Sequence, residues 1–443
     1  METFQRVADA VAADIRSGRL RPGDRLPPQR LFARRRGIAP STAARVYGEL
    51  ARRGLVTGEV GRGTFVRAGR EADAPALAEP AAARVDLELN YPVAPGQSAA
   101  LAAGLQRLLR PDALAAALGP ARAAGTPGAR AAVRDLLARP GWTPGEVLFA
   151  GNGRQAIAAA VAALVPPGGR LAVEELTYPV VLGVAARLGV TAVPVACDGD
   201  GLVPEALAEA HRRTPVHAVY VQPTLQNPHS TTMPPARRAG LAAVLEELGL
   251  HAVEDAVWSF LEPDAVPLAA HAPGRTVLVE GFAKRLAPGL SVGVAVPPAA
   301  LGAPVAAALR AAGSAPSGYA LEAVTGWIGD GTADRVAAAK RADAAARQRV
   351  VAAALPGARL RTAPRSYFCW WDLPAPWRAE TFVAAAARRG IAVTPGAAFA
   401  AGPGAAPNAV RIGTASPSPD VLAGALETLA ALARSAPDEV LGG

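Results

Sequence analysis

Cysteine, lysine and long apolar runs are all scarce in this chain of 443 residues. Its two cysteines, Cys197 and Cys369, are too few to staple a secreted fold, and nothing near them has metal-ligand spacing. Glycine, proline or a charge interrupts every apolar run before the roughly 18 residues that a membrane-spanning helix needs. The first residues, which include Asp9 and Asp14, lack the basic and then apolar pattern of a signal peptide. The sequence therefore predicts a soluble, cytoplasmic protein without a bound metal.

The chain also lacks the low content of hydrophobic residues that is typical of disordered proteins. Hydrophobic residues make up 51% of the chain and charged residues 19%, so a large core can form and offset the loss of chain entropy. At about 150 residues per domain, the length predicts two or three domains. No internal repeat is visible.

The net charge of +9 comes from one end of the chain. Residues 1–70 contain 15 arginines, no lysine and six acidic residues, whereas the rest contains equal numbers of basic and acidic residues. A basic module on a neutral body favours a polyanionic partner for that module, because phosphate contacts supply most of the affinity for nucleic acids. Charge alone leaves open the alternative of a solvated surface enriched in arginine.

The basic module has the pattern of three helices followed by a hairpin. Apolar residues with helical spacing, prolines suited to a first helical turn, and short β-rich runs separated by glycines mark these elements. The expected elements are helices over 4–15, from Pro28, and from Pro40 to about Arg53, and strands over 55–57 and 64–66. This order predicts a mostly α winged helix-turn-helix, whose third helix enters the major groove of DNA.

Residues 3–66 resemble the GntR-type DNA-binding domain. The similarity is carried by Gly18–Pro27, Arg30–Ala33 and Gly61–Val66. Two positions depart from the family, because Ala39 stands where a helix-capping serine is usual and Pro40 replaces a frequent arginine. The resemblance implies that operator DNA is contacted by Arg30, Ser41, Thr42, Arg45, Arg62 and Gly63. A winged helix that makes only protein contacts is the alternative.

A change in composition separates this module from the rest of the chain. The intervening stretch is rich in alanine, proline and acidic residues without periodicity, which is typical of a linker. We expect a winged helix-turn-helix domain over residues 1–69, a linker over 70–85 and a body over 86–443. Within the body we expect a large subdomain over about 125–315 and a small one over about 330–443.

The body alternates short β-rich runs with helical stretches of alanine and leucine, which predicts an α/β fold around a mainly parallel sheet. Several β-rich runs end in polar residues, and such sheets bind ligands at the carboxyl ends of their strands. After the run 147–149, small residues precede a helix and expose backbone N–H groups that suit a phosphate, although joints of this kind are common. Tyr178, Asn227, Asp255 and Lys284 lie at or shortly after the ends of the other β-rich runs.

Only Lys284 and Lys340 are lysines among the 46 basic residues. Arginine can replace lysine as a positive charge, but it cannot form a Schiff base, because its guanidinium does not lose its proton. Lys284 directly follows a β-rich run, which favours a functional role over that of a surface cation. Lys340 lies in a helical stretch of alanine and arginine, and we predict that it is an ordinary surface lysine.

Residues 86–435 resemble the fold-type I aminotransferases, which use pyridoxal 5′-phosphate (PLP), and the fusion to a GntR module resembles the MocR-type transcriptional regulators. The motif over 281–290 carries this similarity most specifically. The resemblance makes Lys284 the lysine that binds PLP covalently, and Arg411 the arginine that binds a substrate carboxylate with two hydrogen bonds. The cofactor contacts it implies are Gly153, Arg154 and Gln155 at the phosphate, Tyr178 on the ring, Asn227 at the phenolic oxygen and Asp255 at the pyridinium nitrogen.

Four residues depart from the aminotransferase pattern. Ser291 replaces the arginine that clamps the cofactor phosphate, and Ala283 replaces a serine that also binds it. Arg154 and Arg285 are the cations that could compensate. The other two departures are Trp258 and Pro120, at positions where tyrosines are expected. We therefore expect reduced PLP affinity, and no physiological transamination beyond half-reactions.

The sequence thus predicts a homodimeric transcriptional regulator that binds duplex operator DNA and senses PLP, or an amino acid or amine that reacts with it. By resemblance, the dimer is expected to be head-to-tail. Two alternatives stay open: an active aminotransferase with an appended DNA-binding module, and a regulator whose body no longer binds PLP. The operator, the effector and the sign of regulation are not encoded in any motif that we recognise.

Overall fold

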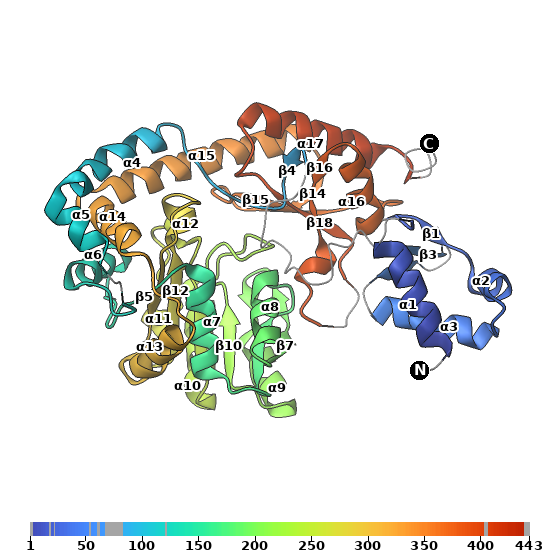
Figure 1. Cartoon of the computed structure of the whole chain (residues 1–443), viewed down its shortest axis with the longest axis horizontal. Coiled ribbons are helices and arrows are strands. Elements are labelled where there is room, and N and C mark those ends of the chain that lie inside the picture. Colours follow the sequence, from blue (N-terminus) through green and yellow to red (C-terminus); the bar gives the residue numbers. More distant parts are fainter. Residues whose placement is uncertain are drawn as a thin grey trace.

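The computed structural model describes residues 3–16, 19–21, 23–52, 55–59, 63–66, 83–119, 122–402 and 406–437. These residues form an N-terminal module, at the right of Figure 1, and a larger body. Most of the predicted linker over 70–85 lies outside the described residues, and its last residue, Val85, already belongs to the first strand of the body.

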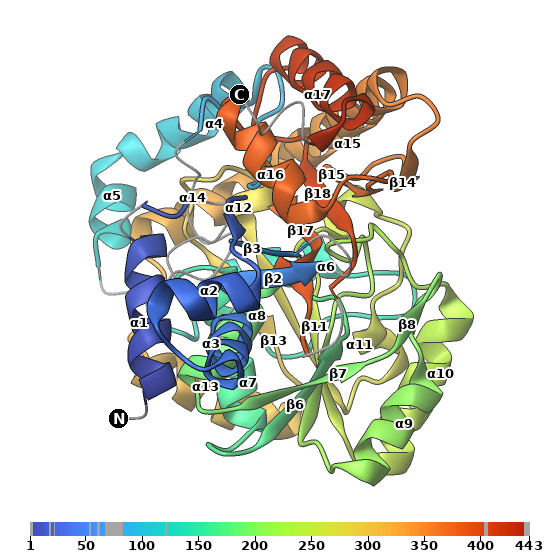
Figure 2. The ribbon, with the colours of Figure 1, turned by 90° about the vertical axis from the view of Figure 1, so that its right-hand side faces the viewer.

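The N-terminal module is a winged helix-turn-helix, as predicted. Its helices α1 and α3 lie side by side in Figure 2, and each contributes an apolar stripe to one core. Val46 and Leu50, one turn apart on α3, are fully buried in that core. The elements are α1 (Thr3–Arg16), β1 (Arg25–Leu26), α2 (Gln29–Arg36), α3 (Pro40–Arg52), β2 (Val56–Glu59) and β3 (Gly63–Val66), with the antiparallel sheet in the order β1-β3-β2.

The body is built around a seven-stranded sheet in the order β5-β13-β12-β11-β10-β6-β7. Five neighbouring strands are parallel, and β13 runs antiparallel to both β12 and β5. The strands are β5 (Leu148–Ala150), β6 (Arg170–Glu174), β7 (Thr191–Val195), β10 (Ala218–Val221), β11 (His251–Asp255), β12 (Thr276–Gly281) and β13 (Gly293–Val296). The mainly parallel sheet is therefore as predicted.

Helices cover both faces of this sheet, which explains why its strands read as continuous apolar runs. Alternate residues of β10 pack into different cores: Ala218 and Tyr220 on one face, Val219 and Val221 on the other. The first face is covered by α7 (Gly153–Leu164), α8 (Pro179–Arg187) and α13 (Gly302–Ala311), and the second by α9 (Pro204–Arg213), α10 (Pro235–Leu248) and α11 (Leu268–His271).

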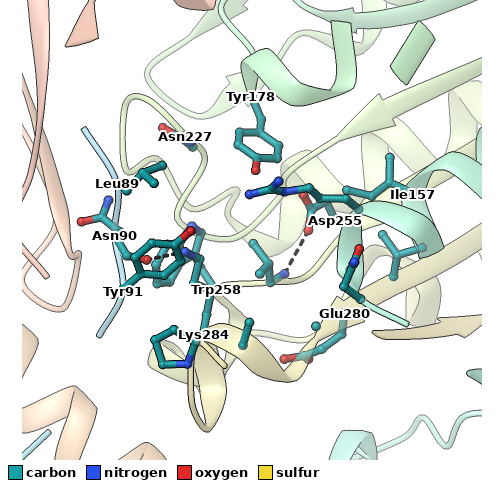
Figure 3. A pocket seen from close by; sticks show the side chains of 18 of the residues that line it. Leu89, Asn90, Tyr91, Ile157, Tyr178, Asn227, Asp255, Trp258, Glu280 and Lys284 are labelled. Atoms are coloured by element: carbon teal, nitrogen blue, oxygen red, sulfur yellow. Dashed lines mark hydrogen bonds between the residues drawn. The ribbon is translucent and has the colours of Figure 1, made fainter. Parts of the chain in front are cut away.

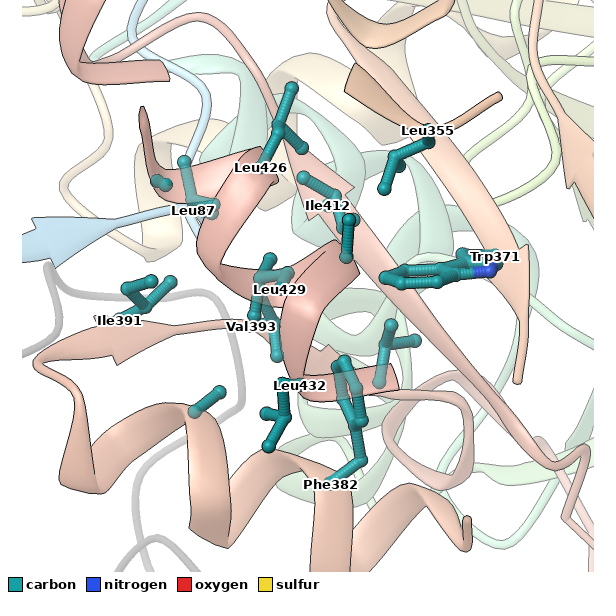
Figure 4. Close-up of a cluster of buried hydrophobic side chains, with 14 of the residues drawn as sticks. Leu87, Leu355, Trp371, Phe382, Ile391, Val393, Ile412, Leu426, Leu429 and Leu432 are labelled. Atoms are coloured by element: carbon teal, nitrogen blue, oxygen red, sulfur yellow. The ribbon is translucent and has the colours of Figure 1, made fainter. Parts of the chain in front are cut away.

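A smaller, four-stranded antiparallel sheet forms the C-terminal part of the body, in the order β14-β15-β18-β17. One of its faces packs against helices through Leu87, Trp371, Phe382, Ile412 and Leu426 (Figure 4). The elements are β14 (Arg359–Arg361), β15 (Phe368–Asp372), α16 (Ala379–Arg388), β16 (Ile391–Ala392), β17 (Thr394–Pro395), β18 (Ala409–Gly413) and α17 (Pro419–Arg434). The first strand of the body, β4 (Val85–Asp86), pairs with β16 and joins the start of the body to its C-terminal part.

The long helix α15 (Thr332–Ala354) runs along the top of the body in Figure 1 and contacts α4, α12 and α14 as well as α17 of the C-terminal part. A further core near the edge strand β5 and its neighbour β13 includes residues of α4, α6 and α14. The remaining elements are α4 (Gln97–Leu105), α5 (Pro111–Ala117), α6 (Pro127–Leu137), β8 (Cys197–Asp198), β9 (Gly201–Leu202), α12 (Phe282–Arg285) and α14 (Gly318–Gly329), with short 3-10 turns over 106–109, 259–261, 299–301 and 396–399.

Close backbone packing fixes the start of α7 above the strand ends. A Cβ added at Gly293 of β13 would lie 2.2 Å from the backbone oxygen of Asn152, and one added at Gly281 of β12 would lie 3.2 Å from the backbone of Gly153. Glycine at these two positions lets the helix N-terminus approach the edge of the sheet where the predicted ligand residues lie. Among the described residues, no helix is long and apolar enough to cross a membrane.

Candidate functional site

A pocket of about 240 Å³ opens at the carboxyl edge of the large sheet. Residues from the sheet, from the start of α7, from the small sheet and from the N-terminal segment of the body line it together (Figure 3). The residues predicted from sequence that line it are Gly153, Arg154, Tyr178, Asn227, Asp255, Trp258, Ala283, Lys284, Ser291 and Arg411. The structure therefore brings together side chains that lie up to about 260 positions apart in the chain.

The start of α7 forms the part of the pocket that suits an anion. The side chain of Asn152 caps the helix by accepting a hydrogen bond from the backbone N–H of Gln155 at 2.9 Å. Gly153 and Arg154, at the first two helical positions, line the pocket. Helix N-termini carry free backbone N–H groups and a partial positive charge, which together favour phosphate.

Asp255 ends β11 and points into the pocket from the sheet. One carboxylate oxygen accepts hydrogen bonds from the Tyr220 hydroxyl at 2.6 Å and the Gln222 side-chain amide at 2.9 Å, and the other accepts one from the backbone N–H of Val257 at 3.1 Å. Burial raises the pKa of Asp255, and these hydrogen bonds act against that shift. The carboxylate is thus held in one orientation.

Two more predicted residues face the same space. Tyr178 precedes α8, and burial raises the pKa of its hydroxyl, while Arg154 nearby acts in the opposite direction. The side-chain oxygen of Asn227 is buried and has no hydrogen-bond partner within the described part of the chain. An unpaired buried polar atom costs free energy, so this amide is placed to bind a ligand.

Lys284 lies on α12, the single helical turn after β12. Its ammonium donates a hydrogen bond to the backbone oxygen of Asn90 and lies 4.4 Å from the centre of the Tyr91 ring. Burial lowers the pKa of Lys284 to about 7, with smaller contributions from Arg154, Arg411 and Lys340. A neutral amine is a nucleophile, so this lysine can react with an aldehyde near neutral pH.

Arg411, on β18, enters the pocket from the small sheet. Its guanidinium donates to the backbone oxygen of Glu88 and to the Thr394 hydroxyl at 3.3 Å. Its Nε is buried without a partner among the residues that the structure places. Burial lowers its pKa to about 10, which leaves the side chain charged at neutral pH and suited to a carboxylate.

Sequence reasoning missed the segment that crosses the pocket near both cations. Glu88, Leu89, Asn90 and Tyr91 line the pocket, and the backbone oxygens of Glu88 and Asn90 bind Arg411 and Lys284. No motif marked these residues, because their main chain makes the contacts. Tyr220 and Gln222 were also missed as partners of Asp255, since the first reads as a core residue of an apolar strand.

Three residues discussed from the sequence, Lys340, Arg285 and Gln155, do not line the pocket. Lys340 is not a surface lysine, and that prediction was wrong: its side chain is fully buried, because it lies on the face of α15 that packs against the α12 turn. Arg285 forms two hydrogen bonds of 3.1 Å with Glu280 and does not line the pocket, so it does not face a phosphate. The side chain of Gln155 is also outside the lining, and Pro120 lies outside the described residues.

The predicted DNA contacts gather on one module. Arg30, Ser41 and Arg45 are exposed and Thr42 is partly exposed, while the Arg45 guanidinium stacks 4.1 Å from the ring centre of Phe4. Gly63, in the wing, has a φ of +124°, a conformation that glycine adopts readily. Arg62 lies outside the described residues.

Comparisons with known proteins agree with this architecture. The family model "Aminotransferase class I and II" matches residues 109–429, and "Bacterial regulatory proteins, gntR family" matches residues 3–66. An uncharacterized HTH-type transcriptional regulator of Bacillus subtilis, YdeF, is 27% identical over 94% of this chain and 90% of its own. The HTH-type pyridoxine biosynthesis transcriptional regulator PdxR of Corynebacterium glutamicum is 26% identical over 64% of this chain and 63% of its own.

Among solved structures, the α-aminoadipate aminotransferase LysN of Thermus thermophilus aligns with a TM-score of 0.69 and 25% identity, over 81% of this chain and 93% of its own. Fold, pocket and matches define a GntR-type DNA-binding module fused to an aminotransferase-like body. The chain belongs to the aminotransferase class I and II family, in the architecture of the MocR-type regulators.

Membership of this family implies PLP as cofactor, and the pocket fits it. The glycine-lined start of α7 matches a phosphate, and the oriented carboxylate of Asp255 matches a pyridinium nitrogen. Asn227 also lines the pocket, and the NH2 group of its side chain is a donor that matches a phenolic oxygen. Lys284, with its lowered pKa, matches the aldehyde carbon. Ala283 and Ser291 line the pocket without adding a cation.

The lowered pKa of Lys284 predicts a pH-dependent effect on stability. The folded value of about 7 lies below the ordinary 10.5, so between these values the unfolded chain binds more protons and stability rises with pH. We expect Lys284→Met to raise the free energy of unfolding of the cofactor-free protein by roughly 3–5 kcal/mol at about pH 6, and by less at about pH 10. Urea denaturation at both pH values measures this. An effect of equal size at both values would contradict the burial of a charged Lys284.

Proposed function

We propose that this protein is a DNA-binding transcriptional regulator whose body binds PLP through Lys284 and senses the cofactor, or an amino acid or amine that reacts with it. The observation that carries the proposal is Lys284 itself, a lysine of lowered pKa in a pocket shared with Asp255 and Arg411. Its fusion to a basic winged helix supports a regulatory use of that pocket.

When bound, PLP supplies an aldehyde conjugated to a ring that withdraws electrons. In the proposed arrangement, Lys284 provides the amine and Asp255 holds the proton on the ring nitrogen. Tyr178 covers the ring, and Asn227 binds the phenolic oxygen. Gly153 and Arg154 receive the phosphate, and Gln155 contributes indirectly, because its backbone N–H holds the Asn152 side chain that caps α7.

The phosphate end of the pocket supports a reduced affinity for PLP. Ser291 and Ala283 occupy its lining where aminotransferases place an arginine and a serine, and Arg285 is engaged by Glu280. Arg154, at the start of α7, is the arginine that lines this end of the pocket. A weakly held cofactor suits a sensor better than a catalyst, so we propose no physiological transaminase role.

The segment over 88–91 supports a route from the pocket to the DNA-binding module. It follows the linker in the chain and binds both Lys284 and Arg411 through backbone oxygens. A ligand that bonds to Lys284 and presents a carboxylate to Arg411 competes with both of these contacts. The name of PdxR, a regulator of pyridoxine biosynthesis, independently supports a ligand related to vitamin B6.

We further propose that the DNA contacts are Arg30, Ser41, Thr42, Arg45, Arg62 and Gly63, within domain boundaries at 1–69, 70–85 and 86–443. The large and small subdomains of the body would then cover about 125–315 and about 330–443. A head-to-tail homodimer fits this proposal, because two DNA-binding modules match an operator with two half-sites.

The cofactor proposal makes a prediction about the phosphate. After incubation with PLP and borohydride, the peptide that contains Lys284 should carry the cofactor, and Lys284→Ala should carry none. Ser291→Arg should tighten PLP binding about tenfold by adding a charge-assisted hydrogen bond, and Arg154→Ala should weaken it by a similar factor. Absorption titration measures both affinities. A wild-type protein without any adduct would refute the proposal.

The DNA proposal makes a prediction about salt. Full-length protein should bind duplex DNA selected from a random library, with an affinity that falls steeply as salt rises. Arg45→Ala should cost about 1–3 kcal/mol if Arg45 reads a base edge, whereas Arg359→Ala, a change to an exposed arginine of the body, should cost nothing. Fluorescence anisotropy at two salt concentrations checks this, and salt-independent binding would count against the assignment.

A further inference from the structure

The second lysine of the chain is bonded to the main chain that carries the first. The Nζ of Lys340, on α15, donates one hydrogen bond to the backbone oxygen of Lys284 at 2.8 Å and another to that of Leu286 at 2.7 Å. The Lys340 side chain is fully buried and does not line the pocket. The two lysines are therefore linked through the backbone, and only Lys284 faces the ligand space.

The two carbonyls belong to a turn with little support of its own. Helix α12 has four residues, Phe282–Arg285, and its end is closed by a hydrogen bond of 2.7 Å from the Leu286 backbone N–H to the Phe282 oxygen. The last carbonyls of a helix lack partners within the helix, and a cation there binds them favourably. The amine of Lys340, whose pKa burial lowers to about 7, donates to two such carbonyls at once.

A series of buried polar contacts leads from Lys340 toward the strand of Arg411. The Tyr367 hydroxyl lies 2.9 Å from both the backbone oxygen of Lys340 and a carboxylate oxygen of Asp343. Asp343 accepts a hydrogen bond of 2.7 Å from Arg347, which in turn donates to the backbone oxygens of Thr414 and Pro417 at 2.6 Å. Helix α15 thus contacts the turn of Lys284 and the segment that follows Arg411.

The presence of a lysine rather than an arginine at position 340 indicates what its side chain does. The chain uses arginine for 44 of its 46 basic residues, yet Lys340 is a lysine. An ammonium can donate from one nitrogen to two carbonyls that converge on it, whereas a guanidinium is a planar fork. Burial of an amine is costly, and an apolar side chain of similar length would fill the same space without that cost. The retained amine indicates that its two hydrogen bonds are needed.

We propose that Lys340 is a positioning residue for the cofactor lysine: by binding the backbone oxygens of Lys284 and Leu286, it holds the α12 turn so that the Lys284 amine faces the bound aldehyde. This inference rests on the proposed binding of PLP at Lys284. Lys340 acts through the backbone of Lys284 and contacts neither the cofactor nor an amino compound.

The test compares two ligands on full-length protein. PLP has an aldehyde that bonds to Lys284, whereas pyridoxamine 5′-phosphate fills the same pocket without an aldehyde. Lys340→Met keeps the length and removes the donor, so PLP affinity should fall about tenfold or more while pyridoxamine 5′-phosphate affinity changes less than about twofold. The yield of borohydride-fixed PLP on Lys284 should fall in parallel. Absorption and fluorescence titrations give the two affinities.

The matched control is Arg341→Met, on the next residue of α15. Arg341 donates to the backbone oxygen of Phe260 at 2.9 Å and does not contact the α12 turn, so neither affinity should change. If Lys340→Met does not fold, as judged by circular dichroism, Lys340→Gln takes its place. Its amide nitrogen is one bond closer to the backbone than Nζ and carries no charge, so it should show the same selective loss of PLP affinity.

Three results would overturn the inference. Equal losses for both ligands would make Lys340 a support of the whole pocket, and no loss for either would make its hydrogen bonds irrelevant to Lys284. If the wild-type protein binds pyridoxamine 5′-phosphate but not PLP, the positioning of Lys284 fails while the pocket stands. A wild-type protein that binds neither ligand would refute the proposed function itself.

Discussion

The burial of one amine, that of Lys284, constrains the rest of the pocket. Removing the side chain from water lowers its pKa, and Arg154 and Arg411 in the same pocket lower it further. Such a concentration of cations favours ligands that bring negative charge, because attraction is stronger where water is excluded. A phosphate at the start of α7 and a carboxylate at Arg411 would both supply it. The pocket therefore suits an anionic aldehyde and its adducts with amino acids.

The fold brings these groups together by packing at close range. Glycines at 153, 281 and 293 let the start of α7 approach the strand ends, so that the backbone N–H groups and Asp255 border one space. Arg411 arrives from the small sheet, and the segment over 88–91 arrives from the start of the body. A change in the position of Lys284 or Arg411 therefore reaches residues 88–91, which lie where the linker enters the body.

Much of this site could be predicted from the sequence, since parallel strands present their carboxyl ends at one edge. Asp255 and Lys284 follow apolar runs, and that order alone placed them in one layer. The scarcity of lysine in the chain further indicated that Lys284 has a chemical role. Lys340 could not be predicted in the same way, because one face of α15 is exposed and the other is buried, and its pattern of alanine and arginine resembles that of a wholly exposed helix.

The backbone contacts of the segment over 88–91 could not be predicted from the sequence either. Glu88 and Asn90 bind Arg411 and Lys284 through backbone oxygens, so their side chains carry no signal of these contacts, and they lie 323 and 194 positions from their respective partners. Arg285 illustrates the opposite case, in which a cation next to Lys284 satisfies a buried carboxylate, Glu280, and is not among the residues that line the pocket. The sequence predicted that Arg285 lies next to Lys284, but it did not predict which group its side chain binds.

The central claim is that occupancy of the Lys284 pocket changes DNA binding, and its most direct test is the affinity of full-length protein for one selected duplex with and without PLP. Because coupling between two sites is reciprocal, the same factor must appear in the affinity for PLP with and without the duplex. The account predicts a change of about fivefold or more in both measurements for the wild-type protein, and none for Lys284→Ala. Equal affinities in the wild-type protein, despite an adduct on Lys284, would contradict it.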